Sequence, residues 1–104
     1  MKKVSIIYSA TIFEEMKNGV EDLGVKAYSI IPTVYGKGLT TNPRYDNHVW
    51  PGKNQMMVIV CDEKSSKKIL EKINKLREEL PNEGIVGFVE NVENITRHQK
   101  ENKL

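Results

Sequence analysis

Residues 55–80 read QMMVIVCDEKSSKKILEKINKLREEL, and this stretch holds the two patterns that decide the fold. Residues 55–61 predict a central strand buried on both faces, because they are apolar from the second residue to the last. Asp62 or Ser65 can cap a helix that continues to Leu80. The apolar side chains of this helix recur every three or four positions and would form one buried stripe: Ile69, Ile73, Leu76 and Leu80.

The same strand-then-helix order opens the chain. Residues 2–8 are rich in β-branched and apolar side chains and predict a strand. Ser9 and Thr11 are candidate N-caps for the next helix, and Thr11 with Glu14 matches the spacing of a capping box. This helix would run to about Leu23, with one apolar face made of Ile12, Met16, Val20 and Leu23.

Two further strands complete the predicted sheet. Gly24 follows the first helix, as a left-handed C-terminal cap would, and residues 25–35 predict the next strand. Pro32 lies inside this strand and indicates an edge, a bulge or a bend, because proline donates no ladder hydrogen bond. Pro81 ends the second helix, and residues 85–89 predict the last strand.

The predicted order is therefore βαββαβ, an α+β fold of ferredoxin-like type with a four-stranded antiparallel sheet and two helices on one face. We expect a single domain over residues 1–104. It contains a long loop at 36–53 without periodicity, and it ends in a polar segment at 93–104, a short helix or a tail. Loops of this length are uncommon in small domains and are usually functional or disordered.

Two helices cannot cover both faces of four strands, so one face of the predicted sheet is left open. We expect this face to carry part of residues 56–61 together with Tyr28 and Ile30. An uncovered apolar face usually marks an interface, and the sequence therefore predicts a homo-oligomer.

Composition and charge exclude several classes of function. The net charge of +2 is too small to indicate a nucleic-acid or membrane partner. Residues 56–61 contain none of the aromatic side chains on which an RNA-recognition motif stacks bases, so we expect no nucleic-acid partner. The apolar runs are too short to cross a bilayer or to form a signal peptide, which predicts a cytoplasmic protein.

Residues for catalysis or metal binding are few. Cys61 is the only cysteine and the only nucleophile that could be paired with His48 as a base, but a cysteine that ends an apolar strand is typical of a buried core. His48 and His98 have no other ligands at the spacing of a zinc site. We therefore expect a binding protein rather than an enzyme, with no metal site encoded locally.

The long loop carries the clearest candidates for binding. In Tyr35-Gly36-Lys37-Gly38, two near-adjacent glycines could turn backbone amides outward beside a lysine and cradle an anion, although Gly-x-Gly after a strand is also ordinary turn chemistry. Further along, Val49 and Trp50 are apolar residues in a polar segment. They either pack back onto the domain or form a docking surface.

Four stretches of the chain together resemble the nitrogen regulatory protein P-II superfamily, and most closely its divergent P-II-like branch. They are LGVKAYSI at 23–30, VYGKG at 34–38, PGKN at 51–54, and GIVGFV at 84–89 followed by Val92-Glu93. The resemblance rests on their order, their spacing and a few glycines, and it covers most of the chain.

This resemblance implies a homotrimer with the sheets facing inward. It also implies a signalling role, which for the family's namesakes is nitrogen regulation. Small effectors would bind in clefts between subunits at the base of the long loop. The loop would change shape with the effector and engage a target protein such as a transporter or an enzyme.

The resemblance also implies which residues act. Gly36, Lys37, Gly38 and Thr40 would line the effector cleft, together with Gly84 from a neighbouring subunit. A second group, Tyr45, His48 and Trp50, would belong to the recognition loop.

Two departures from typical P-II proteins bear on the ligand. An Arg-Gln pair of those proteins is replaced here by Leu39 and Thr40, and their Gly-Asp-Gly-Lys run is absent from residues 80–85. ATP and 2-oxoglutarate sensing of the typical kind is therefore not expected. The effector is left open as another adenine nucleotide, another anion or a metal ion. The alternative function is a metal-binding or metal-responsive trimer of similar architecture that uses His48.

Overall fold

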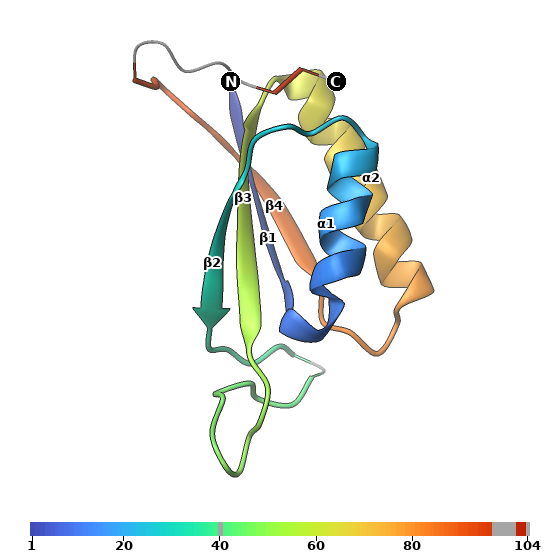
Figure 1. Ribbon diagram of the computed structural model, residues 1–104. Coiled ribbons are helices and arrows are strands. Elements are labelled where there is room, and N and C mark those ends of the chain that lie inside the picture. Colours follow the sequence, from blue (N-terminus) through green and yellow to red (C-terminus); the bar gives the residue numbers. More distant parts are fainter. Residues whose placement is uncertain (40, 97–101, 104) are drawn as a thin grey trace.

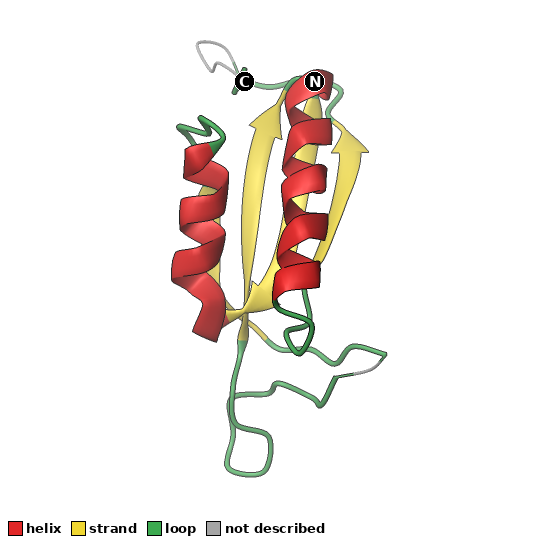
Figure 2. Ribbon diagram, turned by 90° about the vertical axis from the view of Figure 1, so that its right-hand side faces the viewer, coloured by secondary structure: helices red, strands yellow, loops and turns green. Residues whose placement is uncertain are grey.

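The computed structural model describes residues 1–39, 41–96, 102 and 103. Its four strands pair antiparallel in the order β2-β3-β1-β4, and both helices cover the same face of the sheet (Figures 1 and 2). The elements follow one another as β1 (Lys2–Ser9), the 3₁₀ helix η1 (Ala10–Ile12), α1 (Phe13–Asp22), β2 (Ser29–Val34), β3 (Asn54–Cys61), α2 (Glu63–Glu79) and β4 (Val86–Asn91). The predicted ferredoxin-like α+β fold is confirmed.

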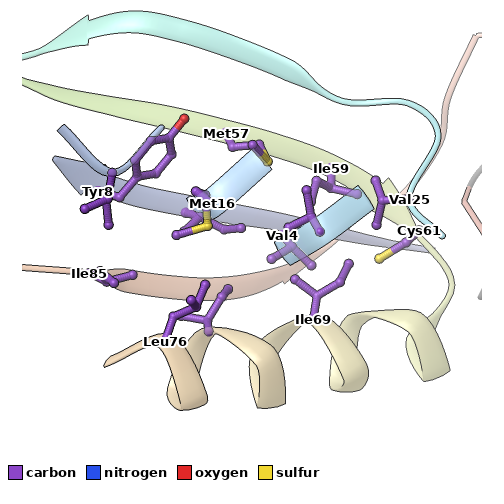
Figure 3. Packing of buried hydrophobic residues seen from close by; sticks show 14 residues of the cluster. Val4, Tyr8, Met16, Val25, Met57, Ile59, Cys61, Ile69, Leu76 and Ile85 are labelled. Carbon is purple, nitrogen blue, oxygen red and sulfur yellow. The ribbon is translucent and has the colours of Figure 1, made fainter. Parts of the chain in front are cut away.

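The core lies between the sheet and the two helices (Figure 3). The two central strands turn every second side chain towards the helices, and these six side chains are 0% exposed: Val4, Ile6, Tyr8, Met57, Ile59 and Cys61. From the helices, Met16 of α1 and Ile69 of α2 reach into the same layer and are also fully buried. Burial of each large apolar side chain contributes about 1.5–3 kcal/mol, so this layer supplies most of the driving force for folding.

The opposite face of the sheet has no helix over it. One apolar row crosses all four strands, because the register aligns Ile31, Met56, Ile7 and Val86. Phe88 lies in the next row and is 41% exposed. Tyr28 and Ile30 were expected on this face, and that prediction is wrong. Both pack against the buried core, since Ile30 is paired with Met57 and not with Met56.

The edge strand β2 is shorter than predicted. It begins at Ser29 instead of residue 25, and its register with β3 shifts between Ile31 and Val34. Pro32 lies in this irregularity at the edge of the sheet, as its missing donor predicted. At the other end of the chain, residues 93–96 form no helix, residues 97–101 lie outside the described residues, and Asn102 pairs with Cys61 through an isolated bridge.

The start of the first helix differs from the prediction. The Thr11–Glu14 capping box is wrong, because Thr11 lies in the middle of η1 and α1 begins only at Phe13. Ser9 acts as the cap, since its side chain accepts a hydrogen bond from the Thr11 amide at 3.4 Å. At the other end, Gly24 has a φ of 99°, so the predicted left-handed residue is confirmed.

Asp62 caps α2 and makes stability depend on pH. Its Oδ1 atom accepts a hydrogen bond from the Ser65 amide at 2.8 Å, and the hydrogen bonds to Ser65 hold the pKa of Asp62 below its ordinary value. A depressed pKa in the folded state stabilises the fold above the unfolded-state pKa of about 3.9. This stabilisation disappears as the pH falls through the lower, folded-state value.

We expect the Asp62→Asn variant to lose this acid-dependent part of the stability. Asparagine is as good an N-cap as aspartate, so the helix itself should survive at neutral pH. Melting temperatures of the two proteins should therefore converge as the pH falls from about 4 to about 2. A difference in melting temperature that stays the same at all pH values would contradict the role assigned to the Asp62 carboxylate.

Among the described residues, no helix is both long enough and apolar enough to cross a membrane.

Candidate functional site

The long loop, residues 36–53, extends beyond one end of the sheet and is organised as two consecutive turns (Figure 1). The first turn is closed by an antiparallel bridge, in which the amides of Gly36 and Arg44 each donate to the other residue's carbonyl, at 3.0 and 2.7 Å. Inside it, the Gly38 amide donates to Thr41 Oγ1 at 3.1 Å. Both glycine amides are therefore used within the loop in this conformation and do not point at an external anion.

The second turn spans residues 45–52. The Asn47 side chain organises it, because Oδ1 accepts hydrogen bonds from the amides of Val49 and Trp50 at 3.1 and 2.7 Å. Asp46 and Gly52 have positive φ angles of 53° and 102°, and the Asp46 amide donates to the Gly52 carbonyl at 2.8 Å. Asparagine, aspartate and glycine are the residues that tolerate such geometry, so the sequence of the tip is suited to its shape.

Arg44 connects the long loop to two other parts of the structure. Its Nη1 atom donates to Asn54 Oδ1 at 3.0 Å, and its Nη2 atom lies 3.9 Å from Glu83 Oε2. The side chain of Arg44 is only 18% exposed. Asn54 begins β3 and Glu83 precedes β4, so one guanidinium ties the loop to the sheet and to the segment after α2.

A cleft of about 530 Å³ opens beside this guanidinium, which is within the range of small-molecule sites. Its walls come from the loop and from the segment after α2: Thr41, Asn42, Pro43, Arg44, Pro51, Pro81 and Asn82. An arginine presents five N–H donors in a planar fork, which suits phosphate and carboxylate groups. The cleft can therefore hold an anionic ligand on a partly buried cation.

The structure brings some of the predicted cleft residues together. Gly84 lies against the first turn of its own chain, where an added Cβ would be 3.0 Å from Thr41 Cγ2 and 3.5 Å from Arg44 Nη1. Gly36 pairs with Arg44, while Lys37 is exposed on the turn. Thr40 lies outside the described residues.

Arg44, Asn54 and Glu83 were not among the residues selected from the sequence. Arg44 is the only arginine of the long loop, and this is the one feature of the sequence that could have indicated it as a site residue. Asn54 lies 10 residues from Arg44 and Glu83 lies in the separate segment after α2, so no short sequence pattern indicates these contacts.

The predicted recognition residues lie on the second turn. Tyr45 and Trp50 are 39% and 38% exposed, and His48 is exposed between them. Val49 is 71% exposed and therefore does not pack back onto the domain. The tip thus presents aromatic and aliphatic side chains to solvent.

The residues for the catalytic and metal alternatives are not brought together. Cys61 is 0% exposed and lies at the far end of β3 from the loop that carries His48. Within the described part of the chain, no group of three histidine, cysteine or acidic side chains could hold a metal ion. His98 lies outside that part.

Two buried polar atoms have no hydrogen-bond partner among the described residues, Tyr8 Oη and Gln55 Oε1. Tyr8 and Gln55 are register partners on β1 and β3, at the end of the sheet next to the loop. Burial, with a smaller effect of Tyr28, raises the pKa of the Tyr8 hydroxyl to about 12. The Tyr8 hydroxyl therefore stays protonated at neutral pH and can act only as a neutral donor or acceptor.

Comparison with families of known proteins gives one match over nearly the whole chain. The model described as nitrogen regulatory protein P-II matches residues 1–102. No curated protein matches the sequence.

Solved structures of similar fold include CPII from Thiomonas intermedia K12, described as a nitrogen regulatory PII-like protein. A structure of CPII bound to ADP and bicarbonate is 26% identical, with 86% of this chain and 82% of that chain covered and a TM-score of 0.69. Another, bound to ADP, AMP and bicarbonate, is 25% identical, with 85% and 86% covered and a TM-score of 0.67. A PII-like signaling protein from Thermus thermophilus is 24% identical, with 88% and 85% covered and a TM-score of 0.64, and shows the shared fold.

Proposed function

Because the chain belongs to the nitrogen regulatory protein P-II family, we propose that it is a P-II-like signalling protein with a small effector bound at the base of its long loop. The observation that carries this proposal is the cleft of about 530 Å³ that Arg44 lines, since the side chain of Arg44 is partly buried and cationic. The same arginine holds the loop to β3 and to the segment before β4. A ligand on Arg44 would therefore change the contacts that shape the loop.

The proposed effector is an adenine nucleotide, alone or with a small anion. CPII, at 26% identity, is bound to ADP and bicarbonate in its structure. Phosphate and bicarbonate are the kinds of group that an arginine fork binds through paired hydrogen bonds. Thr41 and Asn42 add polar side chains to the same walls.

The active form in this proposal is a homotrimer with the uncovered sheet faces turned inward. The apolar row formed by Ile31, Met56, Ile7 and Val86 supports it, because every strand contributes one apolar side chain to a face that no helix covers. Phe88, 41% exposed in the next row, extends this apolar surface. Assembly would place the cleft beside a second subunit and complete it there. The cytoplasmic location and the single domain over residues 1–104 expected from the sequence belong to the same proposal.

The target-binding surface would be the tip of the long loop. Its exposed side chains include Val49 and Trp50, and Leu39 on the first turn is fully exposed. Exposed aromatic and aliphatic side chains on a loop are typical of protein contacts. The target would be another protein, such as a transporter or an enzyme, and the chain itself would carry out no reaction.

The effector is tested by thermal shift with ADP, AMP, ATP, cyclic AMP, bicarbonate, 2-oxoglutarate and divalent metal ions, each tested separately and bicarbonate also with ADP. A ligand present at 100 times its Kd adds about 2.7 kcal/mol to the stability of a protein that binds it only when folded. We expect ADP or AMP to raise the melting temperature, and bicarbonate to add to this effect. A rise with a metal ion alone would support the metal-responsive alternative at His48. No rise with any nucleotide or anion would overturn the proposal.

The position of the effector is tested by Arg44→Ala. A hydrogen bond to a charged group contributes about 1.5–3 kcal/mol, so the variant should bind the nucleotide roughly ten to a hundred times more weakly. Arg44→Lys keeps the charge but loses the planar fork. Its affinity for the nucleotide should therefore lie between that of the unaltered protein and that of Arg44→Ala. Arg77→Ala is the matched control, because it removes the same charge from an exposed position on α2. Equal affinities for Arg44→Ala and Arg77→Ala would place the effector elsewhere.

A further inference from the structure

Asn102 occupies a notch at the end of β3 away from the long loop, beside Cys61, which is the register partner of Lys2 on β1. One side of the notch is the backbone of residues 26–27, which leads into β2. The other side is the end of β3 at residues 60–62. A parallel bridge pairs Asn102 with Cys61, so a residue from the C-terminal segment is seated at the margin of the sheet.

The notch exists because β2 and β3 diverge there. The two strands pair where Ser29 faces Val58, and the same register continued would bring Ala27 opposite Val60. No backbone pairing forms between Ala27 and Val60 in the described structure, and the carboxamide of Asn102 bonds to both of them instead. One side chain therefore replaces a rung of the sheet.

The carboxamide of Asn102 uses its full hydrogen-bonding capacity in the notch. Its Oδ1 atom accepts from the amides of Lys26 and Ala27 at 3.0 and 3.1 Å. Its Nδ2 atom donates to the carbonyls of Ala27 and Val60, both at 2.9 Å. An asparagine side chain offers two acceptor and two donor positions, and all four are matched. A carboxylate would lack the donors and would set negative charge against two carbonyl oxygens.

The backbone of Asn102 adds two further contacts. Its amide donates to the Val60 carbonyl at 3.1 Å, and its carbonyl accepts from the Asp62 amide at 3.2 Å. All of these bonds are polar. None of the described residues after β4 belongs to the buried core cluster.

The contacts described for Asn102 are all hydrogen bonds, so we expect its side chain to be able to leave the notch. Each such bond replaces a bond to water and contributes little net free energy, while docking the segment costs conformational entropy. The docked state should therefore be favoured over the released state by only about tenfold. When Asn102 is released, the amides of Lys26, Ala27 and Asp62 can bond with water. They can also bond with another group that has the same arrangement of donors and acceptors.

We propose that this notch is a recognition site for a primary carboxamide and that Asn102 is its detachable internal ligand. An asparagine side chain of a peptide added in solution presents the same two acceptor and two donor positions, and it binds the notch when Asn102 has left. Occupancy holds residues 26–27 against β3 at the point where β2 begins. This inference does not depend on the proposed effector.

The experiment compares amide hydrogen exchange in full-length wild type, Asn102→Asp, Asn102→Leu and Asn74→Asp. Asn74 is exposed on α2, so Asn74→Asp controls for the added charge. We expect the amides of Lys26 and Ala27 to exchange roughly tenfold faster in both Asn102 variants and to be unchanged in Asn74→Asp. The amide of Ile59 in the core reports whether each variant is folded. Unchanged exchange at Ala27 in folded Asn102→Leu overturns the proposal.

A second step tests recognition itself. A synthetic peptide with the sequence of residues 97–104, RHQKENKL, is added at millimolar concentration to the Asn102→Asp protein. The Asn-containing peptide should restore slow exchange at Ala27, and the same peptide with Asp in place of that Asn should not. If the two peptides act alike, the notch does not recognise the carboxamide and the proposal fails.

Discussion

The Phe88→Asp variant is expected to behave as a monomer of 11.9 kDa, and the unaltered chain is expected to have three times that mass if it forms the proposed trimer. Phe88 is 41% exposed on the uncovered face of the sheet, so an aspartate there reaches water in the isolated subunit and should leave its fold intact. In the proposed trimer the same carboxylate is buried against apolar side chains. Burying an unpaired charge costs on the order of several kcal/mol, and every ~1.4 kcal/mol weakens association tenfold.

Sedimentation equilibrium or light scattering measures this effect directly. Val49→Asp is the matched control, because it makes a similar apolar-to-acidic change at the 71%-exposed tip of the loop, outside the sheet. It should retain the mass of the unaltered protein and instead weaken binding of a target. An unchanged mass for Phe88→Asp would exclude the uncovered face as the interface.

The elements predicted best are those whose pattern is long and unambiguous. The strand predicted at 55–61 is found at Asn54–Cys61. Of the two candidate caps of the next helix, Asp62 and Ser65, the structure uses Asp62, and the helix spans Glu63–Glu79. Both patterns follow from burial: one is continuously apolar and the other repeats every three or four residues. Pro32 also correctly indicated the irregular pairing of β2 with β3. Proline lacks an amide hydrogen in any context, so this effect can be read from the residue itself.

The face assignment of β2 failed for a general reason. Alternation along a strand divides side chains into two sets, but a shift of one residue exchanges the buried and exposed sets. Tyr28 and Ile30 are apolar, and so is Ile31, so composition did not distinguish the two sets. The register with Met57 decides the matter, and register is a long-range property that a single sequence does not contain.

The candidate site was predicted only in outline. The glycines at 36 and 38 and the long loop predict a ligand site at the base of the loop, and this stays a prediction. Gly84, expected there from a neighbouring subunit, lies against the first turn of its own chain. The guanidinium of Arg44 could not be located in advance, because its position depends on Asn54 and Glu83. The sequence likewise predicts only a polar terminal segment around Asn102, because nothing near this residue indicates its hydrogen bond to the Ala27 carbonyl.

The second large effect is expected for Ile69→Ala, which should lower the free energy of unfolding by about 2–5 kcal/mol. Ile69 is 0% exposed and points from α2 towards Val4 in the layer between helix and sheet (Figure 3). The cavity left behind cannot close easily, because α2 already packs tightly on the sheet: a Cβ on Gly87 would lie only 2.8 Å from Ile73 Cδ1.

Equilibrium denaturation of a graded series separates this cavity effect from other causes. Ile69→Val removes one methylene group and should cost about 0.5–1.5 kcal/mol, while Lys67→Ala on the exposed side of the same helix should change little. All variants must be compared at one protein concentration, because the stability of an oligomer depends on concentration. The trimer mass and the nucleotide affinity of folded Ile69→Ala should equal those of the unaltered protein, since Ile69 lies on neither the uncovered face nor the cleft. If Ile69→Ala cost no more than Ile69→Val, the packing of α2 on the sheet would not be the main source of stability.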